Sequence, residues 1–218
     1  GAWNNELQQN LTAVVGNANY DIGHLFGASG GGGNAGCIGC VCISPTGTTN
    51  NAKGSGYTSP ADGIPQGDNF DIDYVAHEMG HQLGANHTFS HGLESAGTNM
   101  EPGSGSTIMG YAGITGTNTD VQAHSEPYFH AISISQVQTN LTSKTCDVET
   151  SVANNPPVIG ALPTYNIPKG TSFVLSATVT DPENDPMTFT WEEVDNASVT
   201  INKTNLGKAV SYEFSTSA

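Results

Sequence analysis

The sequence has no arginine, and its five basic residues are all lysines. They face 20 acidic residues, so the formal net charge is −15. Proteins that bind nucleic acids or anionic membrane surfaces use Lys and Arg to neutralise phosphates, and this balance argues against both kinds of partner. Long hydrophobic runs are also lacking, because no stretch of about 18 apolar residues occurs that could insert into a membrane as a helix.

Cysteine is scarce, with four residues in the chain: Cys37, Cys40, Cys42 and Cys146. An even number of cysteines in an acidic, glycine-rich chain predicts an exported protein with disulfide bonds. The alternative is a zinc-binding cysteine cluster, which would normally need a second Cys-x-x-Cys or a Cys/His pair at zinc-finger spacing. Neither is present, so we favour disulfides, whose pairing the sequence alone leaves open among three possibilities.

Periodic segments occupy much of the first 150 residues. Helical spacing of apolar residues predicts helices over residues 4–15, 68–83 and 126–143, the second of which ends at Gly84. The apolar face of the first helix would carry Leu7, Leu11, Val14 and Val15.

Strands and loops are less clearly marked. Alternating or short apolar runs predict strands over residues 19–27 and 37–43. The four-glycine run at residues 30–33 and the aperiodic segment 50–66 are predicted to be loops.

The composition changes near residue 150, where Asn154-Asn155-Pro156-Pro157 has the character of a linker. Beyond it, short β-rich runs separated by turn residues predict a β-sandwich with strands at residues 172–179, 187–191, 198–201 and 209–214. The predicted organisation is a first domain over residues 1–150, a linker over 151–157 and a partial sandwich module over 158–218.

An acidic turn, Asp181-Pro182-Glu183-Asn184-Asp185, lies within this module. It resembles a turn found in cadherin-like and other Ig-like modules, and oxygen ligands at alternate positions would suit a structural Ca²⁺ ion. A solvated acidic turn without a metal explains the same residues equally well.

The central chemical feature is the segment from His77 to His87. On a helix, His77 and His81 are one turn apart on the same face, so both imidazoles can reach one Zn²⁺ ion. Gly84 allows a sharp turn after the helix, and His87 can then return as a third ligand. Glu78 is placed to address a water at the open fourth position, which is the plan of a catalytic rather than a structural zinc site.

The pattern His-Glu-x-x-His-x-x-Gly-x-x-His resembles the zinc-binding signature of the metzincin metallopeptidases. Metzincins also carry a methionine in a tight turn beneath the metal, and Met109 stands 22 residues after His87 in the sequence Ser-Thr-Ile-Met-Gly-Tyr. The resemblance implies an α+β catalytic domain with a twisted mixed sheet and an active-site helix, here followed by the partial all-β Ig-like module.

Within the metzincins, the chain is most similar to the reprolysin (adamalysin) group, especially its bacterial relatives, over about residues 1–146. The segments that carry this similarity are residues 20–24, the glycine-rich stretch with Cys42, residues 108–113 and residues 127–130. The resemblance implies that one catalytic Zn²⁺ is bound by the three histidines, and that Glu78 is the general base and later the acid. It also implies the disulfides Cys42–Cys146 and Cys37–Cys40.

Two substrate-binding segments follow from the same resemblance. An edge strand that pairs with an extended substrate would include Ile22, Gly23, His24 and Leu25. The wall of the pocket for the side chain just after the cut bond would include Tyr111, Ala112 and Gly113. In the astacin-like and serralysin-like branches a tyrosine placed like Tyr111 can also reach the metal or the oxyanion.

These expectations describe a secreted zinc endopeptidase acting on proteins or peptides. Two alternatives stay open: a zinc-containing adhesion or binding module that has lost its activity, and another hydrolase on the same zinc plan, such as an amidase. The lack of arginine favours internal cleavage, since no guanidinium is available to clamp a substrate carboxylate. Over residues 1–150, 13 acidic residues face 2 lysines, a net charge of −11 that predicts a negative cleft.

One feature departs from the family pattern. Only 76 residues precede His77, fewer than a metzincin domain usually places before its zinc motif. The resemblance therefore predicts further strands on a missing N-terminal segment or a companion chain.

Overall fold

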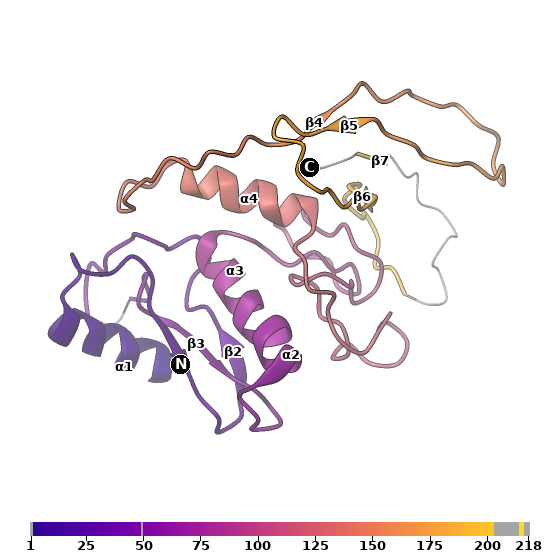
Figure 1. Ribbon diagram of the computed structural model, residues 1–218. Helices are drawn as coiled ribbons and strands as arrows, with labels where there is room; N and C mark the ends of the chain where they lie inside the picture. The colour runs from indigo at the N-terminus through magenta and orange to yellow at the C-terminus, as the bar shows by residue number, and fades with distance from the viewer. Residues whose placement is uncertain (1, 49, 203–213, 216–218) are drawn as a thin grey trace.

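The computed structural model describes residues 2–48, 50–202 and 214–215, the last two by their backbone (Figure 1). A small sheet lies between helix α1 (Ala2–Asn10) on one face and helix α3 (His77–Leu83) on the other. Its strand order is β1-β3-β2, with β1 (His24–Phe26) parallel and β2 (Gly32–Asn34) antiparallel to the central β3 (Gly56–Ser59). The predicted α+β class is therefore confirmed for this part of the chain.

The N-terminal helix docks on the sheet through polar side chains. Helix α1 continues into the π-helical segment η1 (Leu11–Val15), so helical backbone reaches the predicted end. The predicted apolar face is wrong for Val14 and Val15, which are exposed, whereas Leu7 and Leu11 are half-buried. The fully buried residues of α1 are Asn4 and Gln8. The Nδ2 atom of Asn4 donates to the backbone oxygen of Ser55 at 2.6 Å. Backbone groups next to β3 need hydrogen-bond partners, and side-chain amides supply them better than apolar residues could.

Two strands fall on segments that were predicted to be loops: β2 overlaps the glycine run at residues 30–33 and extends to Asn34, and β3 lies within residues 50–66. Conversely, the predicted strand over residues 37–43 is wrong, because this segment forms turns along the end of α3. There the backbone N–H of Gly39 donates to the oxygen of His81 at 2.8 Å, and that of Val41 donates to the oxygen of Gln82 at 3.1 Å. These backbone N–H groups therefore donate to the last carbonyls of a helix and not to the edge of a sheet.

The zinc-motif helix was predicted over residues 68–83 and runs from 67 to 83. It begins as α2 (Gly67–Phe70), continues as the π-helical η2 (Asp71–Ala76) and ends as α3. Gly84 follows with φ of 124°, a backbone conformation in the left-handed region that favours glycine. All four carbonyls of the last turn have partners, since Leu83 accepts from Asn140 Nδ2 at 2.8 Å and Gly80 accepts from Gly84 and Ala85.

Helix α4 (Ala131–Leu141) is shorter than the predicted helix over residues 126–143. His130 is its N-cap, and the Nδ1 atom of His130 accepts from the backbone N–H of Ile132 at 3.1 Å. Helix α4 packs beside α3, and Phe129 and Val137 cover a buried cluster that includes Met109. No helix in the described part of the chain is long and apolar enough to cross a membrane.

Beyond α4 the described chain forms two antiparallel strand pairs. Strand β4 (Val158–Ile159) pairs with β5 (Val179–Thr180), and β6 (Glu192–Glu193) pairs with β7 (Phe214–Ser215). The predicted strands over residues 187–191 and 198–201 are wrong, because neither segment is a strand, and the predicted strand over 172–179 overlaps β5 only at Val179. Strand β4 was not predicted, and most of the strand expected at 209–214 lies outside the described residues. The Ig-like sandwich and the domain boundaries stay predictions.

The acidic turn at residues 181–185 uses its carboxylates internally. The Oδ1 atom of Asp181 accepts the backbone N–H groups of Glu183 at 3.0 Å and Asp185 at 2.9 Å. The carboxylate of Glu183 binds the side-chain amide of Asn155 at 2.6 Å. These contacts give no support to the predicted Ca²⁺ site.

Two disulfides lie within residues 37–146. They join Cys37 to Cys40 and Cys42 to Cys146, which is the pairing that the resemblance implied. The second disulfide links the turns beside the end of α3 to the segment that follows α4, across 104 residues of sequence. The turns that bond to the end of α3 are thus linked covalently to the segment after α4.

Candidate metal centre

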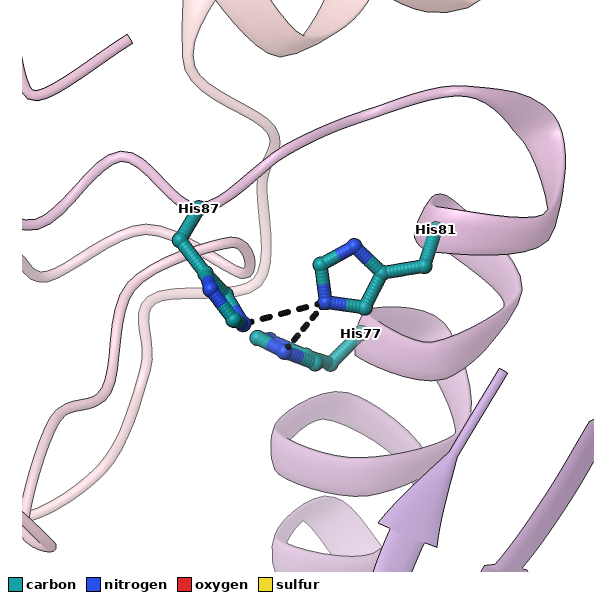
Figure 2. A group of neighbouring side chains, drawn as sticks. All are labelled: His77, His81 and His87. Carbon is teal, nitrogen blue, oxygen red and sulfur yellow. Dashed lines mark hydrogen bonds between the residues drawn. The ribbon is translucent and has the colours of Figure 1, made fainter. Parts of the chain in front are cut away.

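Three histidine side chains converge at the end of the zinc-motif helix. His77 and His81 project from α3, and His87 returns from the loop that follows (Figure 2). The Nε2 atom of His81 lies 3.1 Å from Nε2 of His77 and 3.1 Å from Nε2 of His87. Nitrogen ligands at 2.0–2.1 Å from a tetrahedral Zn²⁺ lie about 3.3 Å apart, so this spacing fits one shared ion.

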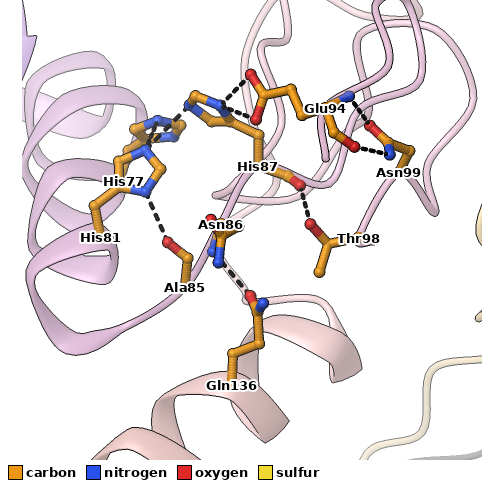
Figure 3. Close-up of polar contacts among 9 residues, drawn as sticks. All are labelled: His77, His81, Ala85, Asn86, His87, Glu94, Thr98, Asn99 and Gln136. Carbon is orange, nitrogen blue, oxygen red and sulfur yellow. Dashed lines mark hydrogen bonds and ion pairs between the residues drawn. The ribbon is translucent and has the colours of Figure 1, made fainter. Parts of the chain in front are cut away.

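The outward ring nitrogen of each histidine faces an acceptor. The Nδ1 atom of His77 lies 2.6 Å from the oxygen of Ile108, and Nδ1 of His81 lies 2.7 Å from the oxygen of Ala85. Nδ1 of His87 lies 3.1 Å from both carboxylate oxygens of Glu94 (Figure 3). Carbonyl and carboxylate oxygens only accept, so each Nδ1 carries the proton and each Nε2 presents a lone pair to the common centre.

Burial keeps these imidazoles neutral. It lowers the pKa of His77 well below 6.5, and the neighbouring His81 and His87 act in the same direction. Burial also lowers the pKa of His81 to about 4 and lowers the pKa of His87, an effect that Glu94 partly opposes. Three neutral imidazoles with converging lone pairs form a donor set that suits Zn²⁺.

Glu78 lies beside this centre, between the helix and strand β2. Burial raises the pKa of Glu78 to about 7, although a hydrogen bond from the backbone of Ala35 lowers it. A Cβ atom at Gly33 would lie 2.4 Å from Cγ of Glu78, closer than real side chains approach. Glycine at this position of β2 is therefore what lets the carboxyl group pack against the strand.

Met109 lies in a turn, and its neighbour Ile108 contacts His77. The side chain of Met109 is fully buried and belongs to a cluster with Ala85 and Ile108. The backbone N–H of Thr88, next to His87, donates to the oxygen of Met109 at 3.1 Å. The same turn presents the Ile108 oxygen to His77, so it supports two of the three ligands through its backbone.

A cleft of about 350 Å³ opens over this group and is lined by the β2 glycines, His77, Glu78 and residues 110–114. The predicted pocket residues Tyr111, Ala112 and Gly113 all line it. The ring of Tyr111 stands 4.4 Å from the ring of His87, centroid to centroid, and burial raises the pKa of Tyr111 to about 12. A larger cavity of about 620 Å³ lies between residues 128–134 and the C-terminal strands, away from the histidines.

The predicted substrate strand around Ile22, Gly23, His24 and Leu25 is not brought to this cleft. His24 and Leu25 lie in β1, at the edge of the sheet opposite β2, and Ile22 and Gly23 directly precede it. His24 is held by its two ring nitrogens, 2.7 Å from Oε1 of Gln82 and 2.7 Å from Oγ1 of Thr58. His24 of β1 therefore contacts Gln82 of the zinc-motif helix, and the strand that lines the cleft is β2.

Several polar residues near the centre carry no sequence signal. Glu94 contacts His87 from a loop without periodicity. Asp73, one turn before His77, accepts from the backbone N–H of Ser125 at 2.8 Å and lies 2.7 Å from Nδ1 of His124. The general rule that ligand histidines have an outer partner could have suggested an acceptor such as Glu94, but not Asp73.

The model of metallopeptidase family M12B, reprolysin-like, matches residues 1–143. The comparisons with curated proteins and with solved structures found no match. The matched span covers well over half of the chain and contains all three histidines, Glu78 and Met109. The chain therefore belongs to the reprolysin-like metallopeptidase family M12B.

Proposed function

We propose that the chain is a secreted zinc endopeptidase in which His77, His81 and His87 hold the metal and Glu78 moves the proton. The observation that carries this proposal is the convergence of three Nε2 atoms beside a carboxyl group whose pKa burial raises to about 7. A general base works best when its pKa lies near the working pH. The family assignment supports hydrolysis of peptide bonds.

A bound Zn²⁺ supplies a Lewis acid that lowers the pKa of water and polarises a peptide carbonyl. Glu78 takes the proton from the attacking water and delivers it to the nitrogen of the leaving amine. The position of the carboxyl group, between the histidines and β2, suits both transfers. Tyr111 keeps its hydroxyl proton, because its pKa is raised to about 12, and can donate a hydrogen bond within the cleft.

An extended peptide would bind along β2. This strand is an edge of the described sheet, its Gly32 and Gly33 line the cleft, and Gly33 touches Glu78. Adding a strand to a sheet edge fixes a substrate through its backbone and leaves side-chain choice to the pockets. Residues 111–113 would then wall the pocket for the side chain after the cut bond. The absence of arginine supports internal cleavage.

Secretion is supported by the two disulfides, which form and persist in oxidising compartments.

Cleavage of casein or gelatin by the purified chain tests the proposal. We expect cleavage that a chelator abolishes and stoichiometric Zn²⁺ restores. Zinc binding without cleavage of any protein substrate would instead identify a silent binding module. Cleavage that persists in the metal-free protein would contradict the assigned chemistry.

A further inference from the structure

His87 is held differently from the other two histidines. His77 and His81 come from one helix, and backbone oxygens fix both rings. His87 lies in a loop, and its Nδ1 partner is the side chain of Glu94 (Figure 3). The direction of its Nε2 atom therefore depends on how well the loop that carries Glu94 is ordered.

Glu94 is in turn held by Asn99. The backbone N–H of Glu94 donates to Oδ1 of Asn99 at 2.9 Å, and Nδ2 of Asn99 donates to the backbone oxygen of Glu94 at 2.8 Å (Figure 3). These two bonds close a ring between the residues, and Asn99 is buried. Asn99 thus fixes the backbone from which the Glu94 carboxylate reaches His87.

Asn99 is itself bound by the C-terminal part of the chain. Its backbone N–H donates to Oδ1 of Asn196 at 2.9 Å, and its oxygen accepts from the N–H of Ala197 at 2.9 Å. The N–H of Ile201 donates to the oxygen of Ser90 at 2.9 Å, at the start of the same loop. The side chains of Ala197 and Ile201 are buried, so this segment is docked rather than merely adjacent.

We propose that residues 196–201, which we call the clamp segment, are a working part of the metal centre although they lie beyond the 143 residues matched by the family. The clamp segment holds Asn99, Asn99 holds Glu94, and Glu94 orients His87. This inference rests on the proposed zinc site. The three residues Asn196, Asn99 and Glu94 are positioning residues, because none of them reaches the substrate or the metal.

The physical consequence is a higher affinity for the metal. When the loop is already ordered before the ion binds, metal binding does not have to offset the loss of the loop's conformational entropy. Loss of an outer partner of a ligand histidine typically weakens metal binding about 10–100-fold. Loss of one hydrogen bond further along the chain should weaken it about twofold to tenfold.

Competition for Zn²⁺ with a chromogenic chelator, using the full chain, tests the proposal. Glu94→Ala should weaken zinc binding about tenfold or more, and Glu94→Gln, which keeps an acceptor oxygen, should restore most of the affinity. Asn196→Ala should weaken binding about twofold to tenfold. The matched control is Asn155→Ala, because the Asn155 amide also lies after α4 but binds Glu183 away from the histidines. This control should bind zinc like the unaltered chain.

A double variant separates positioning from general support of the fold. If Asn196 acts through Glu94, then Asn196→Ala should have no further effect once Glu94 is alanine. The visible absorption bands of bound Co²⁺ should also shift in Glu94→Ala and Asn196→Ala, since they report ligand geometry. Unaltered zinc affinity in Asn196→Ala, or effects of the two substitutions that simply add, would overturn the proposal. An unaltered chain that binds no zinc would refute the zinc site itself, which is a distinct result.

Discussion

Glu78 lies against the backbone of β2 with no side chain between them. Its carboxyl group contacts the space where a Cβ atom of Gly33 would stand, and the backbone of Ala35 donates to it. This contact desolvates the carboxyl group and also sets where it stands relative to the histidines. At the residue scale, the reactivity of Glu78 therefore depends on Gly33, a residue without any side-chain chemistry of its own.

Substituting Gly33→Ala should displace Glu78 and reduce kcat/KM by about 10²-fold or more, because general acid–base catalysis contributes at least that much. Zinc content should not change, since the histidines do not touch Gly33. The measurement is peptide hydrolysis alongside metal analysis. Gly92→Ala is the matched control, because nothing lies within 4 Å of a Cβ at that position. Equal activity of the two variants would contradict the account.

The buried histidines predict that the metal-free protein is sensitive to acid. In the unfolded chain histidine titrates near 6.5, whereas burial lowers the pKa of His81 to about 4 in the folded chain. As the pH falls between these values, the unfolded chain binds protons that the folded chain does not, so stability is lost. Glu78 opposes this trend, because its raised pKa contributes stability at low pH that is lost as the pH rises toward about 7.

Urea unfolding with a chelator present, at pH 7 and at pH 4.5, measures this effect. The shift at His81 alone is worth on the order of 3 kcal/mol over the full window. His81→Ala should lose less stability on acidification than the unaltered chain. The same pH dependence in both proteins would show that His81 contributes nothing to it.

The site residues that could be predicted from the sequence are those that stand at fixed intervals along the chain. His77, His81 and His87 stand at intervals that one helix turn and one glycine turn bring together. Glu94 has no such interval, since a loop of irregular backbone places it beside His87. Its position depends on hydrogen bonds with residues distant in sequence, which a motif does not contain.

At the scale of elements, two other segments of the chain support the end of α3. Turns at residues 39–41 and the side chain of Asn140 satisfy its last carbonyls, and Cys42 and Cys146 bind these two supports together. The Cys42–Cys146 disulfide therefore holds the chain on both sides of the helix that carries His77 and His81. We expect it to contribute more to stability than the short Cys37–Cys40 link.

Replacing each pair of cysteines by serine tests that expectation. In the chain-entropy model, closing a loop of about 100 residues stabilises the fold by ~4.7 kcal/mol, and closing a loop of a few residues by ~2 kcal/mol. The Cys42→Ser/Cys146→Ser protein should therefore unfold at clearly lower urea concentration than the Cys37→Ser/Cys40→Ser protein. The reverse order would show that the short link, through its turn, is the more important one.

Helices were predictable because their apolar spacing recurs over many residues, as in the run from 67 to 83. Strand β2 was missed because it is short and has glycine at two of its three positions, and β3 was missed because it is short and packs against polar residues such as Asn4 and Gln82. A strand without apolar alternation has no sequence period to detect. The prediction of the substrate strand at residues 22–25 came from the family resemblance and not from a sequence period.

At the scale of the whole molecule, charge and the C-terminal segment both bear on the site. Residues 1–150 carry 13 acidic side chains against 2 lysines, a net charge of −11, and Asp73 and Glu78 line the cleft.

The C-terminal segment is attached at a second place besides the clamp segment, because Oε2 of Glu192 accepts the backbone N–H of Ala131 at 2.7 Å. This bond gives a carboxylate partner to one of the backbone N–H groups at the start of α4, which have no acceptor within the helix.

The negative field should favour peptides that are neutral or basic near the cut bond. Raising the ionic strength from about 0.01 M to 1 M shortens the Debye length from about 30 Å to 3 Å, so the preference for basic peptides should shrink over that range. The measurement is kcat/KM for matched peptides that differ in one Lys or Glu. A preference for acidic residues at low salt would be inconsistent with the charge distribution.

The central claim is that Glu78 moves the proton at a zinc site built by His77, His81 and His87. Measuring zinc content and peptide turnover side by side in the unaltered chain and in Glu78→Gln tests it most directly. The account predicts one zinc per chain in both proteins and a turnover about 10²–10⁴-fold lower in the variant. Near-normal turnover by a Glu78→Gln protein that retains its zinc would contradict it.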